Sequence, residues 1–267
     1  MVRMGIWPRT KLVFSEIKEG MKLKELYMTT IFVTFLGTVV PSFGTYLYYY
    51  EMIELGFSQW QYSTIQIVGF VTTIIGAALY SFLFSKMEYY KVTVLACVVN
   101  SVGALLTMLL CLNFTFGIPP FAFVMVTSTV TDVLYMVFAF MPMLVLYAKL
   151  IPDKIEASVF ALLMGLSNLS KLFLAQNLGN LINLWVGCNT DTLATTTWRL
   201  YAWQSGLSLL PLFLVWMIPK RAQIEKVQRC FNYIEGYIKL NELEQQDSEE
   251  RVALAVKLTE QFSTLSP

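Results

Sequence analysis

The stretch "MPMLVLYAKLIPDKIEASVFALLMGLSNLSKLF", residues 141–173, decides the fold. In it two apolar runs meet at a short charged segment that contains Lys149, Asp153, Lys154 and Glu156. An apolar run of about 20 residues is long enough to cross a membrane as a helix. A proline in the segment "IPDK" favours the end of the first helix there, and an acidic residue in the first turn of the next helix suits its dipole. The stretch therefore predicts two long membrane helices joined by a tight hairpin.

The composition of the whole chain supports a lipid environment. Of its 267 residues, 56% are hydrophobic and only 14% are charged, whereas a soluble domain carries about 25% charged residues. The formal net charge of +1 gives no basic field for nucleic acid. The absence of histidine removes His-based acid–base catalysis and most zinc sites. The 4 cysteines are widely spaced, and no nucleophile–base pair or phosphate-binding loop is evident. We expect no enzymatic activity, no cofactor, no metal and no nucleic-acid partner.

Six apolar segments are long enough to be membrane spans. They cover roughly residues 26–50 (broken at Pro41), 61–85, 92–112, 118–150, 156–186 and 198–218. The fourth segment would run about 50 Å as a straight helix, against a hydrocarbon core of about 30 Å, so it must tilt, kink or protrude. Pro142 lies within it and predicts a kink. The fold class that follows is an all-α membrane protein with six transmembrane helices.

The connecting loops predict the orientation of these helices. Lysine and arginine concentrate in the N-terminal segment, in the second-to-third and fourth-to-fifth loops, and at the start of the tail. The opposite side has only Arg199, and its first loop carries Glu51 and Glu54 without a cation. Positive charge stays on the cytoplasmic side of a membrane. Both termini are therefore expected to be cytoplasmic, and a plasma membrane and an organelle membrane both fit this pattern.

Three regions follow from this topology. Residues 1–25 form a basic cytoplasmic segment, residues 26–219 the six-helix bundle, and residues 220–267 a cytoplasmic helical tail. Apolar residues recur at spacings of 3 and 4 early in the tail, which predicts one or two amphipathic surface helices.

Two ionisable residues, Asp132 and Lys171, lie deep within the fourth and fifth segments. A charge at the centre of a membrane helix costs about 2.5–3.5 kcal/mol on insertion scales, and such residues usually face the bundle interior and mark a pathway. Ser128, Asp132 and Tyr135 share one helical face by their spacing, and Asn168 shares another face with Lys171. These residues are candidates for substrate binding or proton coupling. The alternative is an ion pair between Asp132 and Lys171 that only locks two helices together.

Small residues in the second and third segments predict close helix packing. Gly69, Gly76 and Ala77 lie in the second segment, and Gly103 and Ala104 lie in the third. Residues with little or no side chain let membrane helices approach closely. We interpret these positions as packing sites.

Part of the chain resembles a known family. The stretch "MPMLVLYAKLIPDKIEASVFALLMGLSNLS" is similar to the signature of the folate–biopterin transporter family, a branch of the major facilitator superfamily. The matching residues are Met141, Pro142, Lys149, Pro152, Glu156, Phe160, Ala161, Leu162, Ser167 and Asn168. Residues 54–86 and 207–219 resemble other helices of the second half of such transporters. The resemblance implies that this chain corresponds to the C-terminal six-helix half of a twelve-helix protein.

The resemblance also implies a function and a mechanism. The chain would transport folate-like or pterin-like organic solutes by alternating access, with the solute near the midplane between two halves. Asp132 would accept the guanidine-like edge of a pterin or carry a coupling proton, and Lys171 would bind a carboxylate. Charged residues at the cytoplasmic loops would form a gate whose ion pairs differ between the two states. These gate residues are Lys86, Glu88, Lys91, Lys149, Asp153 and Glu156.

A six-helix half cannot by itself enclose a pathway between two halves. Besides membrane lipid and its solute it needs a partner: the missing N-terminal half, a second copy of itself, or another membrane subunit. The alternative function is that of a non-transporting structural subunit in a membrane complex, derived from such a transporter half.

Overall fold

The computed structural model describes residues 23–151 and 156–228. The chain divides into two compact units, Met1–Arg221 and Ala222–Pro267, and each is considered by itself. Most of the basic N-terminal segment, most of the predicted tail and the gate residue Asp153 lie outside the described residues, as does the side chain of Glu156. Within the described ranges the regular secondary structure is helical, and no strand is formed.

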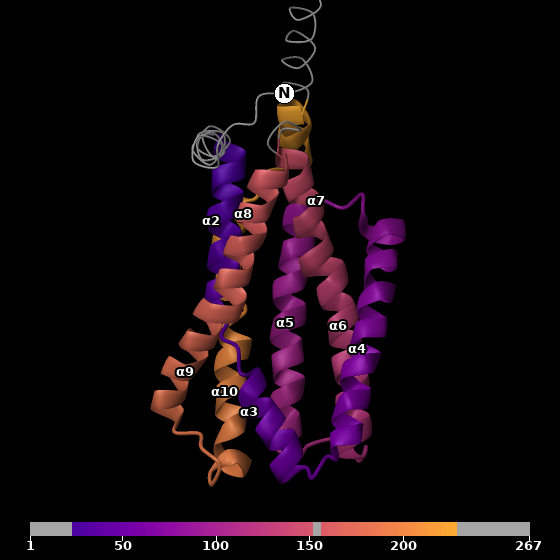
Figure 1. The fold of residues 1–267 in the computed structure, drawn as a ribbon, viewed down its shortest axis with the longest axis vertical. Helices are drawn as coiled ribbons and strands as arrows, with labels where there is room; N and C mark the ends of the chain where they lie inside the picture. The colour runs from indigo at the N-terminus through magenta and orange to yellow at the C-terminus, as the bar shows by residue number, and fades with distance from the viewer. Residues whose placement is uncertain (1–22, 152–155, 229–267) are drawn as a thin grey trace, which may run out of the picture. The chain divides into compact units, whose positions relative to one another are not determined.

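Three spans form the first part of the bundle (Figure 1). The first consists of α2 (Lys24–Val39), α3 (Gly44–Tyr49) and the π-helix η1 (Tyr50–Glu54). The second consists of α4 (Gln59–Leu79) and the π-helix η2 (Tyr80–Phe84), and the third is α5 (Tyr89–Cys111). Ser58 caps α4 through a capping box with Gln61, so two free amides at the helix start are satisfied.

Three further spans complete it. The fourth consists of α6 (Pro120–Tyr135), the π-helix η3 (Met136–Phe140) and α7 (Met141–Leu150). The fifth consists of α8 (Glu156–Asn168), the π-helix η5 (Leu169–Leu174) and α9 (Ala175–Val186), and the sixth of α10 (Leu193–Leu207) and the 3-10 helix η6 (Leu210–Met217). In the described residues, 6 helical stretches are thus long and apolar enough to cross a membrane, which agrees with the prediction.

The sequence predicts a kink at Pro142, and the structure has a π-helix directly before the helix that contains this proline. The π-helix η3 ends at Phe140, and Pro142 stands in the first turn of α7. A proline has no N–H to return to the preceding turn, and a π-helix accommodates an extra residue where the regular ladder is interrupted.

The first span is broken around Pro41, as the sequence predicted. Residues 40–43 between α2 and α3 are not helical. The Ser42 amide donates a hydrogen bond of 3.1 Å to the carbonyl of Ala175 in α9. A Cβ at Gly179 would lie 2.5 Å from the Ser42 carbonyl oxygen, so a glycine is needed there for the close approach of α9. Irregular backbone at membrane depth is tolerated where it is buried in protein or lines a cavity.

Small residues bring the helices together as predicted. A Cβ at Gly76 in α4 would lie 2.7 Å from the Cβ of Met136. A Cβ at Gly103 in α5 would lie 3.0 Å from Cγ2 of Thr131. Both glycines therefore set the distance at which α4 and α5 pack against the fourth span.

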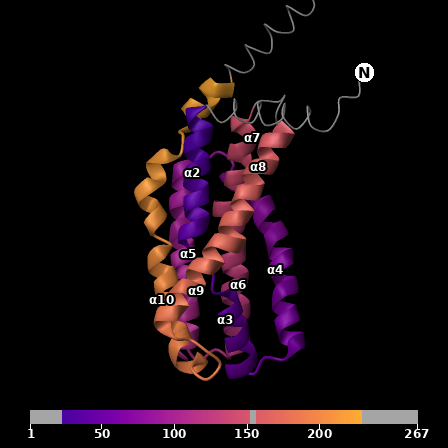
Figure 2. The same ribbon diagram turned by 60° about the vertical axis from the view of Figure 1, so that its left-hand side comes forward.

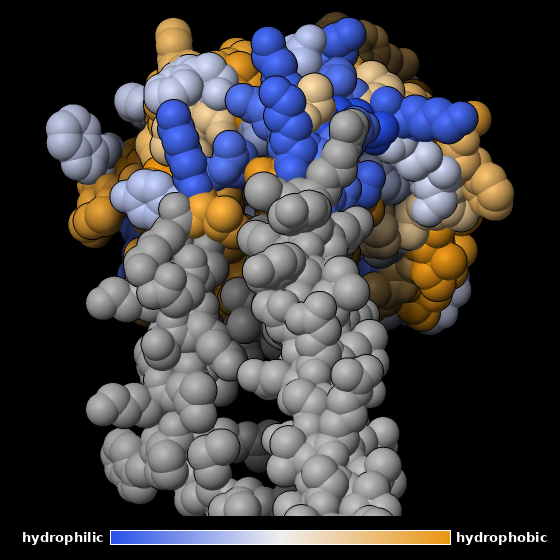
Figure 3. Space-filling model, turned by 90° about the horizontal axis from the view of Figure 1, so that it is seen from above, coloured by the Kyte–Doolittle hydropathy of each residue, from blue (hydrophilic) through white to orange (hydrophobic). Residues whose placement is uncertain are grey.

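The two ends of the bundle differ. The start of α2, the η2–α5 connection and the facing ends of α7 and α8 lie at one end in both ribbon views (Figures 1 and 2), called here the α2 end. Hydrophilic side chains gather at the centre of this end and hydrophobic ones at its edges (Figure 3). Lys24, Lys86 and Lys91 are exposed. On the sides of the bundle, large apolar side chains such as Phe70 and Trp185 are exposed, as lipid or another helix would require.

Candidate functional site

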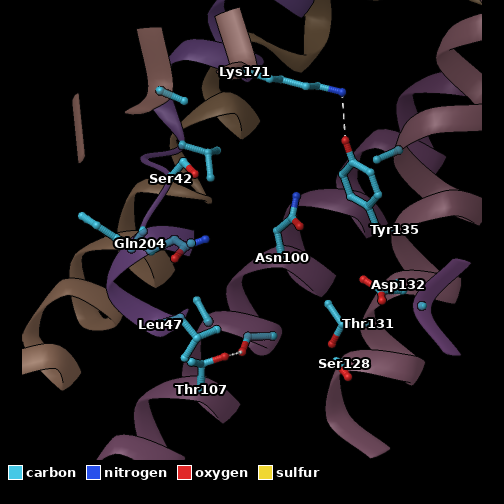
Figure 4. Close-up of a pocket in the computed structure, with 18 of the residues that line it drawn as sticks. Ser42, Leu47, Asn100, Thr107, Ser128, Thr131, Asp132, Tyr135, Lys171 and Gln204 are labelled. Carbon is cyan, nitrogen blue, oxygen red and sulfur yellow. Dashed lines mark hydrogen bonds between the residues drawn. The ribbon is translucent and has the colours of Figure 1, made fainter. Parts of the chain in front are cut away.

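A cavity of about 630 Å³ opens among the helices of the bundle. Its wall includes the non-helical break of the first span and residues from α4, α5, α6, α7, η5 and α10. Its volume is in the range of sites for small organic molecules, about 300–1,000 Å³. Figure 4 shows part of its polar lining. The charged and polar side chains that line it include Ser42, Glu51, Gln66, Asn100, Thr107, Thr127, Ser128, Thr131, Asp132, Tyr135, Lys171 and Gln204.

The predicted polar face of the fourth span borders this cavity. Ser128, Asp132 and Tyr135 all line it. The Ser128 hydroxyl donates a hydrogen bond of 2.7 Å to the carbonyl of Val124, one turn earlier. A Cβ at Gly69 would lie 3.0 Å from Oδ2 of Asp132, so the glycine of α4 leaves room for this carboxylate.

Lys171 is held by aromatic residues of the fourth span. Its Nζ donates a hydrogen bond of 2.8 Å to the Tyr135 hydroxyl (Figure 4). The same nitrogen lies 5.5 Å from the centre of the Tyr135 ring and 5.7 Å from that of Phe140. A cation within about 6 Å of an aromatic face is attracted by the ring quadrupole. Lys171 is thus positioned by a neutral hydroxyl group and two aromatic rings rather than by a carboxylate.

Asp132 and Lys171 line one cavity but form no ion pair with each other within the described part of the chain. In Figure 4 the Tyr135 ring lies between the two charged groups. The alternative in which an Asp132–Lys171 pair merely locks two helices is therefore wrong for this structure. The cavity instead presents an acidic and a basic group at separate positions.

Asn168 is the candidate that the structure does not bring to the site. Its side chain is exposed and is absent from the cavity lining. Asn168 ends α8, and Lys171 lies in η5, which begins at Leu169. A π-helix takes up more residues per turn than an α-helix, so the rule that places i and i+3 on one face fails across this junction.

Sequence reasoning missed several polar lining residues, among them three amides, and misplaced Glu51. Asn100 in α5, Gln66 in α4 and Gln204 in α10 line the cavity. Each is an amide within an apolar segment, and such isolated polar residues in the sequence could have indicated them. Glu51 was assigned to the first outer loop. In the structure it lies in η1 at the end of the first span, where it lines the cavity and is only 5% exposed.

The α2 end contains a contact that the sequence did not predict. The guanidinium of Arg221 donates to the carbonyl of Met87 at 3.1 Å and also to the carbonyl of Ser85. Its Cζ lies 5.4 Å from the centre of the Tyr89 ring, and its main-chain amide donates to the Glu88 carboxylate at 3.3 Å. The end of the sixth span is thereby attached to the turn between the second and third spans, and we call these contacts the Arg221 clamp.

The predicted gate has no ion pairs in this conformation as far as its members are described. Glu88 contacts the amide of Arg221 rather than a lysine. Lys91 lies 6.0 Å from the centre of the neighbouring Tyr90 ring. Lys86 is exposed and Lys149 is half-buried, and neither is paired with an acid in the described part of the chain. The assignment of these residues to a gate stays a prediction.

Comparison with known proteins identifies the family. A model of the BT1 family matches residues 1–231. The chain belongs to this family. The resemblance to folate–biopterin transporters that the sequence indicated is thereby confirmed, and with it membership of the major facilitator superfamily.

Several curated proteins are similar to this BT1-family chain. It is 29% identical to a folate-biopterin transporter of Synechocystis over 79% of the chain and 42% of that protein. It is 25% identical to folate transporter 1 of Plasmodium falciparum over 88% of the chain and 45% of that protein. It is 26% identical to a probable folate-biopterin transporter 4 of Arabidopsis thaliana over 68% of the chain and 37% of that protein. All these names are those of transporters, not enzymes, in line with the prediction that the chain is not an enzyme.

The matches cover only part of each curated relative. The BT1-family chain spans less than half the length of these curated relatives. No solved structure matches it.

Proposed function

We propose that this chain is the solute-binding six-helix half of a membrane transporter for folate-like or pterin-like solutes. The observation that carries the proposal is the cavity of about 630 Å³ in which Asp132 and Lys171 are separate and unpaired with each other. The names of the relatives support the solute class, and their greater length supports a second half that completes the site.

The two charged groups suit the two ends of a folate. The ring edge of a pterin donates hydrogen bonds from neighbouring nitrogens, and a carboxylate accepts such a pair well. The tail of a folate carries carboxylates, and the Lys171 ammonium would attract one of them. Tyr135 and Phe140 would keep the ammonium in place, because a fixed group loses less freedom when the solute binds. Asn100, Ser128 and Gln204 would supply further hydrogen bonds.

Alternating access would then involve the α2 end. In major facilitator proteins the two halves rock about a central site. The charged residues Lys86, Glu88, Lys91, Lys149, Asp153 and Glu156 would pair differently when this end opens and closes. The broken first span supports a transport function, since discontinuous helices are typical of transporter binding sites.

The test is a binding experiment with ligands that separate the two charges. The full chain in lipid nanodiscs would be titrated with folate, with a pterin that has no carboxylate, and with p-aminobenzoylglutamate, which has the tail alone. Asp132→Asn should weaken binding of the pterin, and Lys171→Met should weaken binding of the tail compound. A loss of about tenfold corresponds to about 1.4 kcal/mol.

The matched control is Asn168→Ala, because Asn168 is exposed outside the cavity. Its affinities should equal those of the wild type. Equal folate affinity in the wild type and in the Asp132→Asn/Lys171→Met double variant would contradict the assignment of these two residues to solute binding. Absence of binding to all three ligands, even after co-expression with an N-terminal half of a relative, would favour a structural subunit instead.

A further inference from the structure

Glu51 is a largely buried acidic residue that lines the cavity. Only 5% of its surface is exposed, and its side chain contributes to the cavity wall. The main-chain carbonyl of Glu51 accepts a hydrogen bond of 3.0 Å from the amide of Phe57. Its carboxyl group, by contrast, has neither a hydrogen bond nor an ion pair to any residue within the described ranges.

Among the residues that the structure describes, the ionisable groups that interact with Glu51 carry no positive charge. Tyr62 of α4, Cys111 of α5 and Tyr201 of α10 are close enough to interact with it electrostatically. Tyr48 lies beside Tyr62, with ring centres 4.9 Å apart. Glu54, at the end of the same π-helix, adds a like charge and is exposed.

The neighbouring phenol groups are engaged elsewhere. The Tyr201 hydroxyl donates to the carbonyl of Phe43 at 3.4 Å. The Tyr50 hydroxyl lies 3.4 Å from the carbonyl of Cys111. The one cation that lines the cavity within the described ranges, Lys171, is held by Tyr135. Glu51 therefore lacks the partners that stabilise a buried negative charge.

A buried carboxylate without such partners is unstable. Removing an ion from water costs several kcal/mol even after the protein relaxes, and an unpaired buried acid takes up a proton instead. A protonated carboxyl group is neutral and needs no positively charged partner. It would lose the proton when water reaches it.

We propose that Glu51 is a proton-binding site of the cavity, separate from the solute-binding pair Asp132 and Lys171. This rests on the proposed function. In the conformation described, in which Glu51 is only 5% exposed, its carboxyl group holds a proton; when a change of conformation hydrates Glu51, the proton passes to water and leaves a hydrated carboxylate. Closure takes up a proton from the side that the cavity faces, and opening toward the other side releases that proton there, so one proton crosses together with the solute. Solute movement is thereby coupled to proton movement through Glu51, while Asp132 remains free to contact the solute.

Infrared spectroscopy of the full chain in lipid bilayers tests this without any solute. At neutral pH exposed acidic groups are ionised, since their pKa values are about 4. A band of protonated carboxyl groups should remain in the wild type, should be absent or much smaller in Glu51→Gln, and should be kept in Asp132→Asn. No protonated-carboxyl band in the wild type, or an unchanged band in Glu51→Gln, would overturn the proposal.

A second variant guards against a folding defect. Glu51→Asp keeps a carboxyl group in the same place, so its band should persist at a shifted frequency and titrate at a different pH. Loss of the band in both Glu51→Gln and Glu51→Asp, with both proteins monodisperse, would mean that the band reports the surrounding fold and would count against the proposal.

Calorimetry separates this proposal from the proposed function. Folate binding would be measured in two buffers that differ in ionisation enthalpy, which counts the protons exchanged with the buffer on binding. Glu51→Gln should still bind folate but should lose the buffer dependence seen in the wild type. A wild type that keeps the Glu51 band but binds no ligand would refute the solute class and support the proton site; folate binding with the same proton count in Glu51→Gln would refute the coupling.

Discussion

The Nζ of Lys171 donates a hydrogen bond of 2.8 Å to the hydroxyl of Tyr135, and this contact joins the fourth and fifth spans at the cavity wall. A neutral partner positions the ammonium group without cancelling its charge. The positive charge thus stays available for a ligand, which an ion pair with Asp132 would have prevented.

Tyr135→Phe should lower the free energy of unfolding by a small, measurable amount. The variant keeps the ring that faces the ammonium but removes the acceptor hydroxyl. Hydrogen bonds between membrane helices contribute about 0.6 kcal/mol on average and at most about 1.7 kcal/mol. A double-mutant cycle with Lys171→Met, measured by denaturation in mixed micelles, should give a coupling energy in this range. A coupling of zero would mean that the contact contributes nothing to stability.

Gly69→Ala should weaken pterin binding. The new Cβ would lie 3.0 Å from Oδ2 of Asp132, so the carboxylate must move by a few tenths of an ångström. We expect an affinity loss of roughly fivefold, which is about 1 kcal/mol, in a fluorescence titration with a pterin. Gly165→Ala is the matched control, since a Cβ there meets nothing within 4 Å. Both changes raise helix propensity by up to about 1 kcal/mol, so an equal response of the two would show that Asp132 is not displaced.

Arg221→Ala should loosen the turn between the second and third spans. The variant removes the side-chain hydrogen bonds to the carbonyls of Ser85 and Met87. Trypsin should then cut faster after Lys86, as followed by mass spectrometry of the fragments. Arg221→Lys keeps the charge but cannot reach both carbonyls with a planar fork, so its rate should be intermediate. Arg199→Ala removes an arginine elsewhere and should leave the rate unchanged.

Cysteine labelling should test the predicted orientation. In sealed vesicles a membrane-impermeant maleimide should reach Lys86→Cys from the cytoplasmic side and Thr115→Cys from the opposite side. Cys97, Cys111 and Cys188 are buried and should react slowly. Cys230 lies outside the described residues and would be replaced by serine as a precaution. Labelling of both introduced cysteines from one side would contradict the topology.

The sequence predicted the spans well because long apolar runs have few alternatives. The break in the first span was also predictable, since Pro41 removes a backbone donor at membrane depth. The polar face of Ser128, Asp132 and Tyr135 was found because these residues lie in α6, where the regular helical spacing holds.

The errors at Asn168 and Glu51 have a common physical cause. The helical-face rule assumes the spacing of an α-helix, and it misplaced Asn168 next to η5. The loop boundary was drawn before Glu51, whereas η1 continues the span through Glu54. Periodicity in a sequence does not show where a helix widens, because a π-helix depends on the packing of its neighbours. The contacts of Arg221 were missed for another reason: they join residues far apart in the chain, which helical periodicity does not report.

The π-helix η5 has a consequence for how the fifth span could change. A π-helix holds one more residue per turn than an α-helix, and this surplus residue can be accommodated at different positions along the span while both ends of the span stay in place. If the surplus residue moved from η5 to a position nearer the start of the span, the residues that it passed would turn by about 100°, the rotation of one α-helical residue. Lys171 would turn with them, away from the Tyr135 hydroxyl that it now contacts. A single span could thus exchange the groups that face a solute by local slippage, without the movement of a whole domain.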